Sequence, residues 1–381
     1  MKLILTGLAA MTMSTTAALA GGIDRSGLPI AILFEAGNVA SLSFSSVTPS
    51  LSGDYVAPLS FFGAKTNNMA QPFQTLSFAV KTDLSPKLAL ALMSNQPYGA
   101  DALYTGGAYT GLEAHWSSSE LAMVLKYKLN DQFSVFGGLR NVTSKADINI
   151  PTLLLLGAGS YQAVANSNSQ IGYLIGAAYE KPEIALRASI TYQSAITHDF
   201  ATSELFTPAG GGGGEGRLAA AAMSFPGGSD STTNIILPQS VTLAVQSGIA
   251  ANTLLFGSIK WSEWSKWHVD PALYHGLTGG EVTGFDNDVI TYQLGIGRKV
   301  NDAVSVFARV GYEHASGGTA SRLSPSDGMQ SIGLGGSWTN GTIKVTGGLE
   351  YVMLGDAEDG SGVQFKGNSA LGVGLSVDVK F

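Results

Sequence analysis

The amino-acid sequence predicts an all-β protein, a transmembrane antiparallel β-barrel of about 14 strands with a short N-terminal plug, or hatch. One observation is the composition: 13% of the 381 residues are charged and 49 are glycine. Soluble proteins average about 25% charged residues and about 7% glycine. A second observation is that no run of 18 apolar residues follows the first 20 residues, which excludes helical membrane spans. The third is a repeated alternation of apolar and polar residues, typical of barrel strands.

Residues 1–20 have the features of a secretory signal peptide. Lys2 precedes a short apolar stretch, and the sequence ALA at 18–20 matches the small-residue pattern of a cleavage site. The stretch is too short and too rich in Ser and Thr for the alternative, a membrane anchor. We therefore expect an exported protein with a plug at 21–38 and a barrel at 39–381. The chain contains no cysteine, so disulfides do not stabilise it.

The C-terminal segment SALGVGLSVDVKF shows the alternation most clearly. Every second residue is apolar, namely Leu371, Val373, Leu375, Val377, Val379 and Phe381. Similar segments occur at 39–52, 75–83, 87–94, 120–129, 132–141, 170–180, 183–193, 239–247, 253–262, 289–299, 303–313, 330–338 and 343–353. In a membrane barrel the apolar face contacts lipid and the polar face lines the lumen. A soluble β-sandwich shows the same period, with its apolar faces packed inward.

The links between these segments favour the barrel over the sandwich. Short links with turn residues are expected at 84–87, 130–131, 180–183, 250–252, 301–302 and 340–341. Long links are expected at 54–72, 95–112, 145–168, 198–235, 268–287, 315–328 and 355–368. Short and long links alternate strictly, as they do in bacterial barrels with periplasmic turns and extracellular loops.

The stretch KWSEWSKW at 260–267 ends one outward-running segment. Tryptophan favours the membrane interface. By strand parity we expect Trp261 and Trp267 to face lipid, as part of an aromatic girdle, and Trp264 to point inward. Trp264 is therefore a candidate ligand contact.

Three segments are apolar without lying in a regular strand pattern. The segment 21–38 contains LPIAILF, which is too apolar for a solvated tail, so we expect it to fill the lumen as a plug. Two long links, 150–165 and 204–225, are also apolar. They predict a groove for a hydrophobic ligand, and the alternative is that the loops pack on each other or contact lipid. The groove residues are Leu153, Leu154, Leu155, Leu156, Phe206, Met223 and Phe225.

These residues resemble the FadL-like outer-membrane transporters of long-chain fatty acids and aromatic hydrocarbons over nearly the whole mature chain. LFEAG at 33–37 stands where that family has an Asn-Pro-Ala-Gly type hatch motif, and KWSEWS resembles its Trp-x-x-Trp-Ser stretch. The two apolar links resemble the paired loops of its first substrate site. The hatch is shorter than expected, and Glu35 replaces the Asn-Pro pair.

The resemblance implies a passive outer-membrane channel for hydrophobic small molecules, with capture at the loops, movement of the hatch and release by lateral diffusion. It assigns gating to Ile32, Leu33, Phe34 and Glu35, and contact with the barrel assembly machinery to Phe381. A fatty-acid carboxylate would need an inward cation, for which Lys126, Lys128, Arg140, Arg187, Arg309 and Lys344 are candidates. The alternative is that these cations pair with lumen carboxylates such as Glu313, Glu350 and Asp378.

The sequence is also compatible with two other functions. A general diffusion porin would have an open lumen. An outer-membrane lipid hydrolase could use His115 with Ser117, or His314 with Ser316. Outer-membrane lipids and lipopolysaccharide are expected partners of a monomer. With 21 basic and 28 acidic residues, nucleic acid is not expected as a partner. A formal GxGxxG match at Gly211, Gly213 and Gly216 is part of a glycine run without a βαβ context, so no nucleotide cofactor is expected. No histidine or cysteine pair has zinc spacing, so no metal is expected.

Overall fold

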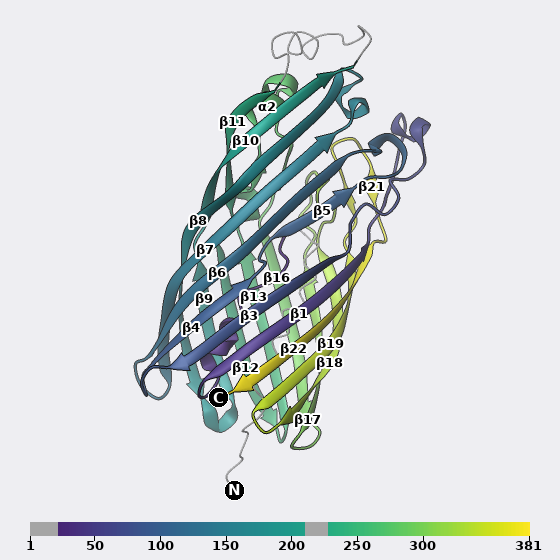
Figure 1. Cartoon of the computed structure of the whole chain (residues 1–381). Coiled ribbons are helices and arrows are strands. Elements are labelled where there is room, and N and C mark those ends of the chain that lie inside the picture. The colour runs from purple at the N-terminus through teal and green to yellow at the C-terminus, as the bar shows by residue number, and fades with distance from the viewer. Residues whose placement is uncertain (1–21, 210–227) are drawn as a thin grey trace.

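The chain folds into a closed barrel of antiparallel strands (Figure 1). The structure is a computed structural model that describes residues 22–209 and 228–381. β1 (Val39–Ser50) pairs with β22 (Ser369–Lys380) along its full length, so the first and last strands close the sheet. The other wall strands are β3 (Phe73–Asp83), β4 (Leu88–Asn95), β5 (Gly99–Leu103), β6 (Glu113–Lys128), β7 (Phe133–Ile150), β8 (Gly159–Lys181), β9 (Leu186–Gln193), β10 (Ile196–Pro208), β11 (Ser229–Leu237), β12 (Ser240–Ala250), β13 (Thr253–Ser262), β16 (Val289–Lys299), β17 (Val304–Glu313), β18 (Met329–Asn340) and β19 (Ile343–Leu354).

The described part of the chain has 17 strands in this sheet, and some of them are halves of one interrupted strand. β4 and β5 both pair with β6, and β9 and β10 both pair with β8. β11 and β12 likewise form one strand, since they pair with β10 and β9 in turn. Counted as continuous strands, they give the predicted 14-stranded barrel.

The wall presents apolar side chains outward and small or polar side chains inward. In β22, Leu371, Val373 and Leu375 are each nearly half exposed, whereas Gly372 and Gly374 between them are buried. The same alternation runs through β6, β16 and β18. The lipid-facing surface predicted from the period-2 pattern is therefore confirmed, and the sandwich is excluded because the apolar side chains do not meet in a dry centre.

The outer ends of several strands are longer than predicted. β7, β8, β10 and β11 extend into 145–168 and 198–235, which were expected to be links. The inward side chains there are apolar as well: Tyr161 and Phe206 are buried inside, while Val164 is half exposed outside. With apolar residues on both faces the alternation is lost. In the described part of the two predicted apolar loops, 159–165 and 204–208 are instead paired strand between β8 and β10.

The prediction for Trp267 is wrong. β13 ends at Ser262 and a 3₁₀ turn, η6 (Trp264–Lys266), follows, so strand parity no longer applies. Trp264 and Trp267 are both fully buried inside the barrel. Trp261 still belongs to β13 and lies on the same face as Ile259, which is 44% exposed.

Residues 22–38 lie inside the barrel and form the plug. Their 3₁₀ turn η1 (Ile30–Phe34) packs on β3 and β4, and Ile32 and Leu33 are buried there. Farther toward the outer end, Asp24 forms an ion pair with Lys260 of β13 at 2.9 Å. None of the helices among the described residues is long and apolar enough to cross a membrane.

Short elements cover the outer end of the barrel. They are β2 (Gly53–Asp54), β14 (His268–Val269), β15 (Thr283–Gly284), β20 (Ala357–Glu358), β21 (Gln364–Phe365), α2 (Ala272–Thr278), η2 (Leu59–Phe62), η3 (Gly107–Tyr109) and η4 (Thr152–Leu155). At the other end, η5 (Pro182–Ile184) links β8 to β9. Asp359 ties the cover together, because it accepts from the Tyr109 hydroxyl at 2.6 Å and from Arg322 Nε at 3.0 Å. Burial raises the pKa of the Tyr109 hydroxyl, which therefore stays protonated as the donor.

Candidate functional site: two cavities and a break in the wall

An apolar cavity of about 100 Å³ lies beneath the outer cover and is called the outer cavity here. β5, β6, β7, β8, β10 and β11 surround it, together with the segments around Trp267 and Leu323. Its apolar lining includes Trp116, Ile148, Leu154, Ile235, Trp267 and Leu323, and its charged lining residues are His115, Asp147 and Arg322. Such a space, mostly apolar with a few polar groups, suits a small hydrophobic ligand.

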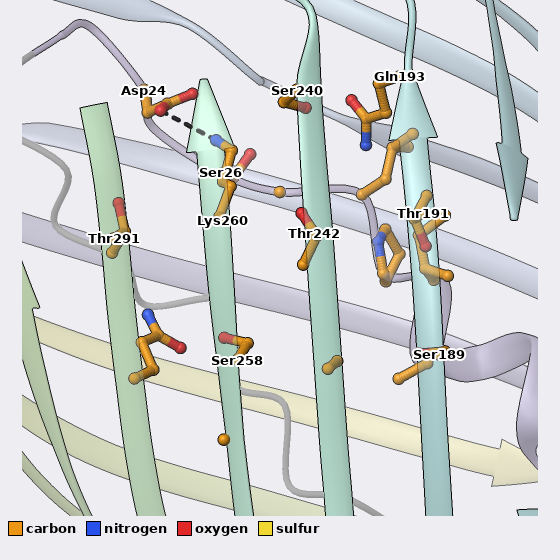
Figure 2. A pocket seen from close by; sticks show the side chains of 18 of the residues that line it. Asp24, Ser26, Ser189, Thr191, Gln193, Ser240, Thr242, Ser258, Lys260 and Thr291 are labelled. Carbon is orange, nitrogen blue, oxygen red and sulfur yellow. Dashed lines mark hydrogen bonds and ion pairs between the residues drawn. The ribbon is translucent and has the colours of Figure 1, made fainter. Parts of the chain in front are cut away.

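A second cavity, of about 310 Å³, lies deeper and is called the inner cavity here. Figure 2 shows hydroxyl and amide side chains along its strands, among them Ser189, Thr191, Gln193, Ser240, Thr242, Ser258 and Thr291. The plug forms one side of it, and the Asp24–Lys260 ion pair lies at its edge. Leu28, Ile30 and Phe34 of the plug also line it, so the lining is mixed, with more polar side chains than in the outer cavity.

The wall has a break where β4 and β5 meet. β3 pairs with β4 from Phe78↔Ser94 to Asp83↔Ala89, but its residues Phe73–Ser77 pair with β1 only. On the other side of the break, Gln96–Tyr98 turns away from β3 and pairs with the plug. We call the region between Phe73–Ser77 and Gln96–Gly99 the wall break.

The plug takes over the hydrogen bonds that the wall lacks at this place. Arg25 N donates to Pro97 O at 2.8 Å, and Ser26 N donates to Gln96 O at 3.1 Å. The Ser26 hydroxyl donates to Gln96 O at 2.7 Å, and Asn95 Nδ2 donates to Ser26 O at 2.7 Å. A small cavity of about 20 Å³ lies beside these contacts. The plug and the wall break therefore form one structural unit.

Phe34 holds the inner part of the plug between two cations. Lys126 Nζ lies 4.1 Å and Arg187 Cζ 4.6 Å from the centroid of the Phe34 ring, and Phe136 packs edge-on against it at 5.9 Å. Cations over an aromatic face stabilise it by roughly 0.5–1 kcal/mol each at exposed sites and more when desolvated. Two of the cations predicted to bind a carboxylate thus contact the plug.

The predicted cations are largely paired. Arg140 lies 2.7 Å from Glu120, and Lys126 lies 3.0 Å from Glu180. Arg309 pairs with Glu350 at 2.5 Å. Arg187 donates to the Gln246 side chain at 2.9 Å. Three of the predicted cations, Arg140, Lys126 and Arg309, therefore pair with carboxylates of the protein, as the alternative interpretation of the sequence had it.

The remaining predicted hatch residues also have defined partners. The backbone oxygen of Glu35 accepts from Lys81 Nζ at 3.0 Å, and its carboxylate lies 3.7 Å from Lys380 Nζ. Ile32 and Leu33 pack against the inside of the wall.

The predicted groove residues fall into separate places. Leu154 lines the outer cavity, and Leu155 and Phe206 are buried in the apolar cluster beside it. Leu153 is 39% and Leu156 is 86% exposed, so they point away from the lumen. Met223 and Phe225 lie outside the described residues.

Trp264 contacts the plug and lines neither large cavity. It packs edge-on against Tyr98 and Phe285, and a side chain at Gly22 would collide with its ring. The residues that sequence reasoning missed are Arg25, Trp116 and Leu323. Only Arg25 had a signal in the sequence, as one of two adjacent charges, Asp24 and Arg25, in a segment expected to be buried.

The histidine and serine pairs do not form a catalytic arrangement. Both ring nitrogens of His115 are occupied, by Asp101 at 2.9 Å and Glu113 at 2.8 Å. His314 contacts the Tyr312 hydroxyl at 3.2 Å, and Ser316 bonds to Asp327 instead. Within 22–209 and 228–381, no group of acidic and histidine side chains could hold a metal ion.

Solved structures with the same fold are barrels of similar length. A FadL homologue of Pseudomonas aeruginosa superposes with a TM-score of 0.74 at 16% identity, covering 93% of this chain and 92% of the other. The toluene transporter TodX of Pseudomonas putida gives 0.62 at 11% identity, covering 95% and 96%. The toluene transporter TbuX of Ralstonia pickettii gives 0.59 at 13% identity, covering 94% and 97%. At these identities the likeness shows the fold alone.

No curated protein sequence matches the chain. The model of one protein family does match it, over residues 5–379, and that family is described as outer membrane protein transport protein (OMPP1/FadL/TodX). The match spans nearly all of the sequence and agrees with the lipid-facing barrel described above. The chain therefore belongs to the OMPP1/FadL/TodX family of outer-membrane transport proteins.

Proposed function

We propose that the protein is a passive outer-membrane channel that takes up hydrophobic small molecules and releases them sideways through the wall break. The observation that carries the proposal is the position of the break, beside the plug and next to the outer cavity. Leu323 lines both the outer cavity and the small cavity at the break. The side chain of Leu323 therefore lies between the outer cavity and the wall break, and its displacement would connect them along apolar side chains.

The physical reason for a sideways exit is the free energy of the cargo. An alkyl chain loses about 0.8 kcal/mol for each CH₂ group that moves from apolar surroundings into water. The inner cavity has more hydroxyl, amide and charged side chains in its lining than the outer cavity, so an inward route would bring the chain past more polar groups. On the outer face of the wall break Leu76 is exposed toward lipid, which is the more favourable destination for such a chain. A general diffusion porin needs the opposite arrangement, a continuous polar path through the lumen.

Two classes of cargo are candidates for this channel. TodX and TbuX, which share its fold, are toluene transporters, and the Pseudomonas aeruginosa protein is a FadL homologue. Long-chain fatty acids and aromatic hydrocarbons both fit a mostly apolar path. We further propose that the channel acts as a monomer, takes cargo from lipopolysaccharide or the medium, and is assembled through Phe381. The function is transport, not catalysis.

Uptake by cells tests this proposal. The protein is produced in the outer membrane of host cells that lack their own channels for these compounds, and uptake of radiolabelled dodecanoate, toluene and maltose is measured. We expect faster uptake of dodecanoate or toluene, or both, than in cells without the protein, and unchanged uptake of maltose. Faster uptake of maltose with no effect on the apolar compounds would identify a diffusion porin instead.

A further inference from the structure

Arg25 of the plug reaches into the wall break. Its guanidinium carbon lies 4.1 Å from the centroid of the Phe73 ring on one side of the break. On the other side it forms an ion pair with Asp101 of β5, and a side chain at Gly99 would collide with it. Arg25 therefore lies across the outer end of the wall break, next to the point where the main-chain pairing of the wall resumes with Gln71 N donating to Asp101 O at 3.0 Å.

Asp101 has a second partner besides Arg25, and Arg25 has a donor that the ion pair does not use. Asp101 is also bonded to His115 at 2.9 Å, so its carboxylate has a second partner if Arg25 moves away. Arg25 Nε is buried and has no hydrogen-bond acceptor, although a guanidinium can donate five hydrogen bonds. Arg25 thus has donors available for a second anion.

The surroundings of this ion pair are apolar. The small cavity at the break is lined by Leu51, Met69, Ala70, Phe73, Ala100 and Leu323, with Arg25 and Asp101 as its charged residues. Because Leu323 also lines the outer cavity, cargo that moves from there toward the break comes next to Arg25. An apolar space with one guanidinium matches a molecule that has an alkyl chain and a carboxylate.

We propose that Arg25 binds the carboxylate of the cargo at the exit, and that this carboxylate takes the place of Asp101 and so draws Arg25 out of the wall break. This inference rests on the proposed function and selects, within it, apolar carboxylates such as fatty acids over neutral hydrocarbons. Asp101 remains held by His115 during the exchange, and no bond is made or broken. Arg25 is then a specificity-determining residue, and it also closes the exit when no cargo is bound.

Binding of two ligands with the same chain length tests the proposal. Affinities for dodecanoate and dodecanol are measured on the purified full-length protein in a sugar-based detergent, for the wild type and for Arg25→Gln, Asp101→Asn and Asp24→Asn. Asp24→Asn is the matched control, because Asp24 is the adjacent plug residue and its wall partner, Lys260, lies away from the break. Heat-dependent gel mobility shows whether each variant keeps a folded barrel.

We expect the wild type to prefer dodecanoate, and Arg25→Gln to reduce the dodecanoate-to-dodecanol affinity ratio by about 10-fold or more, as the loss of a charged hydrogen bond predicts. Asp101→Asn should strengthen dodecanoate binding, and Asp24→Asn should leave the ratio unchanged. The role of Arg25 is overturned if folded Arg25→Gln keeps the wild-type affinity ratio, or if Asp24→Asn lowers that ratio as much as Arg25→Gln does. In either case uptake of apolar cargo would still support the proposed function. Binding without any uptake overturns the proposed function alone.

Discussion

A disulfide between the plug and the wall break would lock the exit. The chain has no cysteine, so Ser26→Cys with Gln96→Cys introduces the only pair. These residues face each other, since the antiparallel bridge Asp24↔Tyr98 continues to Ser26 and Gln96, with Ser26 N 3.1 Å from Gln96 O. Neighbouring antiparallel strands place facing Cα atoms about 4.5–5.5 Å apart, within the range a disulfide spans.

The magnitude follows from the hydrogen bonds that are replaced. The reduced variant loses two bonds of the Ser26 hydroxyl, both with the Gln96 backbone, and one from Leu76 N to Gln96 Oε1. Only the two Ser26 bonds hold the plug, because the Leu76 bond joins two segments of the wall. At about 1 kcal/mol for each Ser26 bond, the plug is held less tightly by about 2 kcal/mol, which is roughly a 30-fold shift toward the open state. We therefore expect reduced protein to transport apolar cargo at least as fast as the wild type, and oxidised protein to transport none.

The assay is uptake of radiolabelled dodecanoate by cells before and after oxidation, and again after addition of a reductant. A matched control is Thr143→Cys with Ser169→Cys, which joins facing residues of β7 and β8 whose hydroxyl oxygens lie 2.6 Å apart. This control bond does not involve the plug and should leave uptake unchanged. Uptake that continues at the wild-type rate through the oxidised Ser26–Gln96 variant refutes the lateral route.

Three further changes have defined outcomes. Phe34→Ala removes the ring between Lys126 and Arg187, so the plug is held less tightly by roughly 1–2 kcal/mol. The ion conductance of single barrels in planar bilayers should therefore rise, and unchanged conductance would argue that residues 22–38 do not block the lumen. Leu154→Asp places a charge in the outer cavity and should weaken dodecanol binding about 10-fold. Leu156→Asp changes an exposed side chain and should leave dodecanol binding unchanged. Equal effects of the two variants would show that cargo does not pass through the outer cavity. Asp359→Asn removes the buried charge that accepts from Tyr109 and pairs with the partly exposed Arg322. It should destabilise the outer cover by about 2 kcal/mol, seen as faster protease cleavage of the outer loops in intact cells; wild-type cleavage would contradict the assigned role.

The sequence predicts the wall well, because lipid on one side and polar side chains on the other force a period of two on every strand. That condition fails at the outer end, where Tyr161 and Phe206 are buried and apolar on the inward face. It also fails after Ser262, where a 3₁₀ turn changes the direction of Trp267. Two of the three strand interruptions had a local signal, since Pro97 and Pro238 each lie between two halves of a strand and proline cannot donate to a ladder. The interruption between β9 and β10 has no proline.

The candidate site was less predictable, because it depends on pairs of residues far apart in the sequence. Arg25 and Asp101 are brought together by the inward turn of the chain between β4 and β5, and no short-range pattern encodes this contact. The lumen cations were correctly placed inside, as Lys126 and Arg187 show. Their contact with Phe34 follows from the path of the plug, which periodicity does not describe.

Photo-crosslinking of a cargo in transit tests the lateral route most directly. A dodecanoate analogue with a diazirine on its chain is added to cells that produce the protein, the cells are irradiated, and the labelled residues are identified by mass spectrometry. The account predicts labels at Leu323 and Phe73, which line the path from the outer cavity to the wall break. Labels confined to Thr242 and Ser258 of the inner cavity would show that cargo passes the plug inward, and would contradict it.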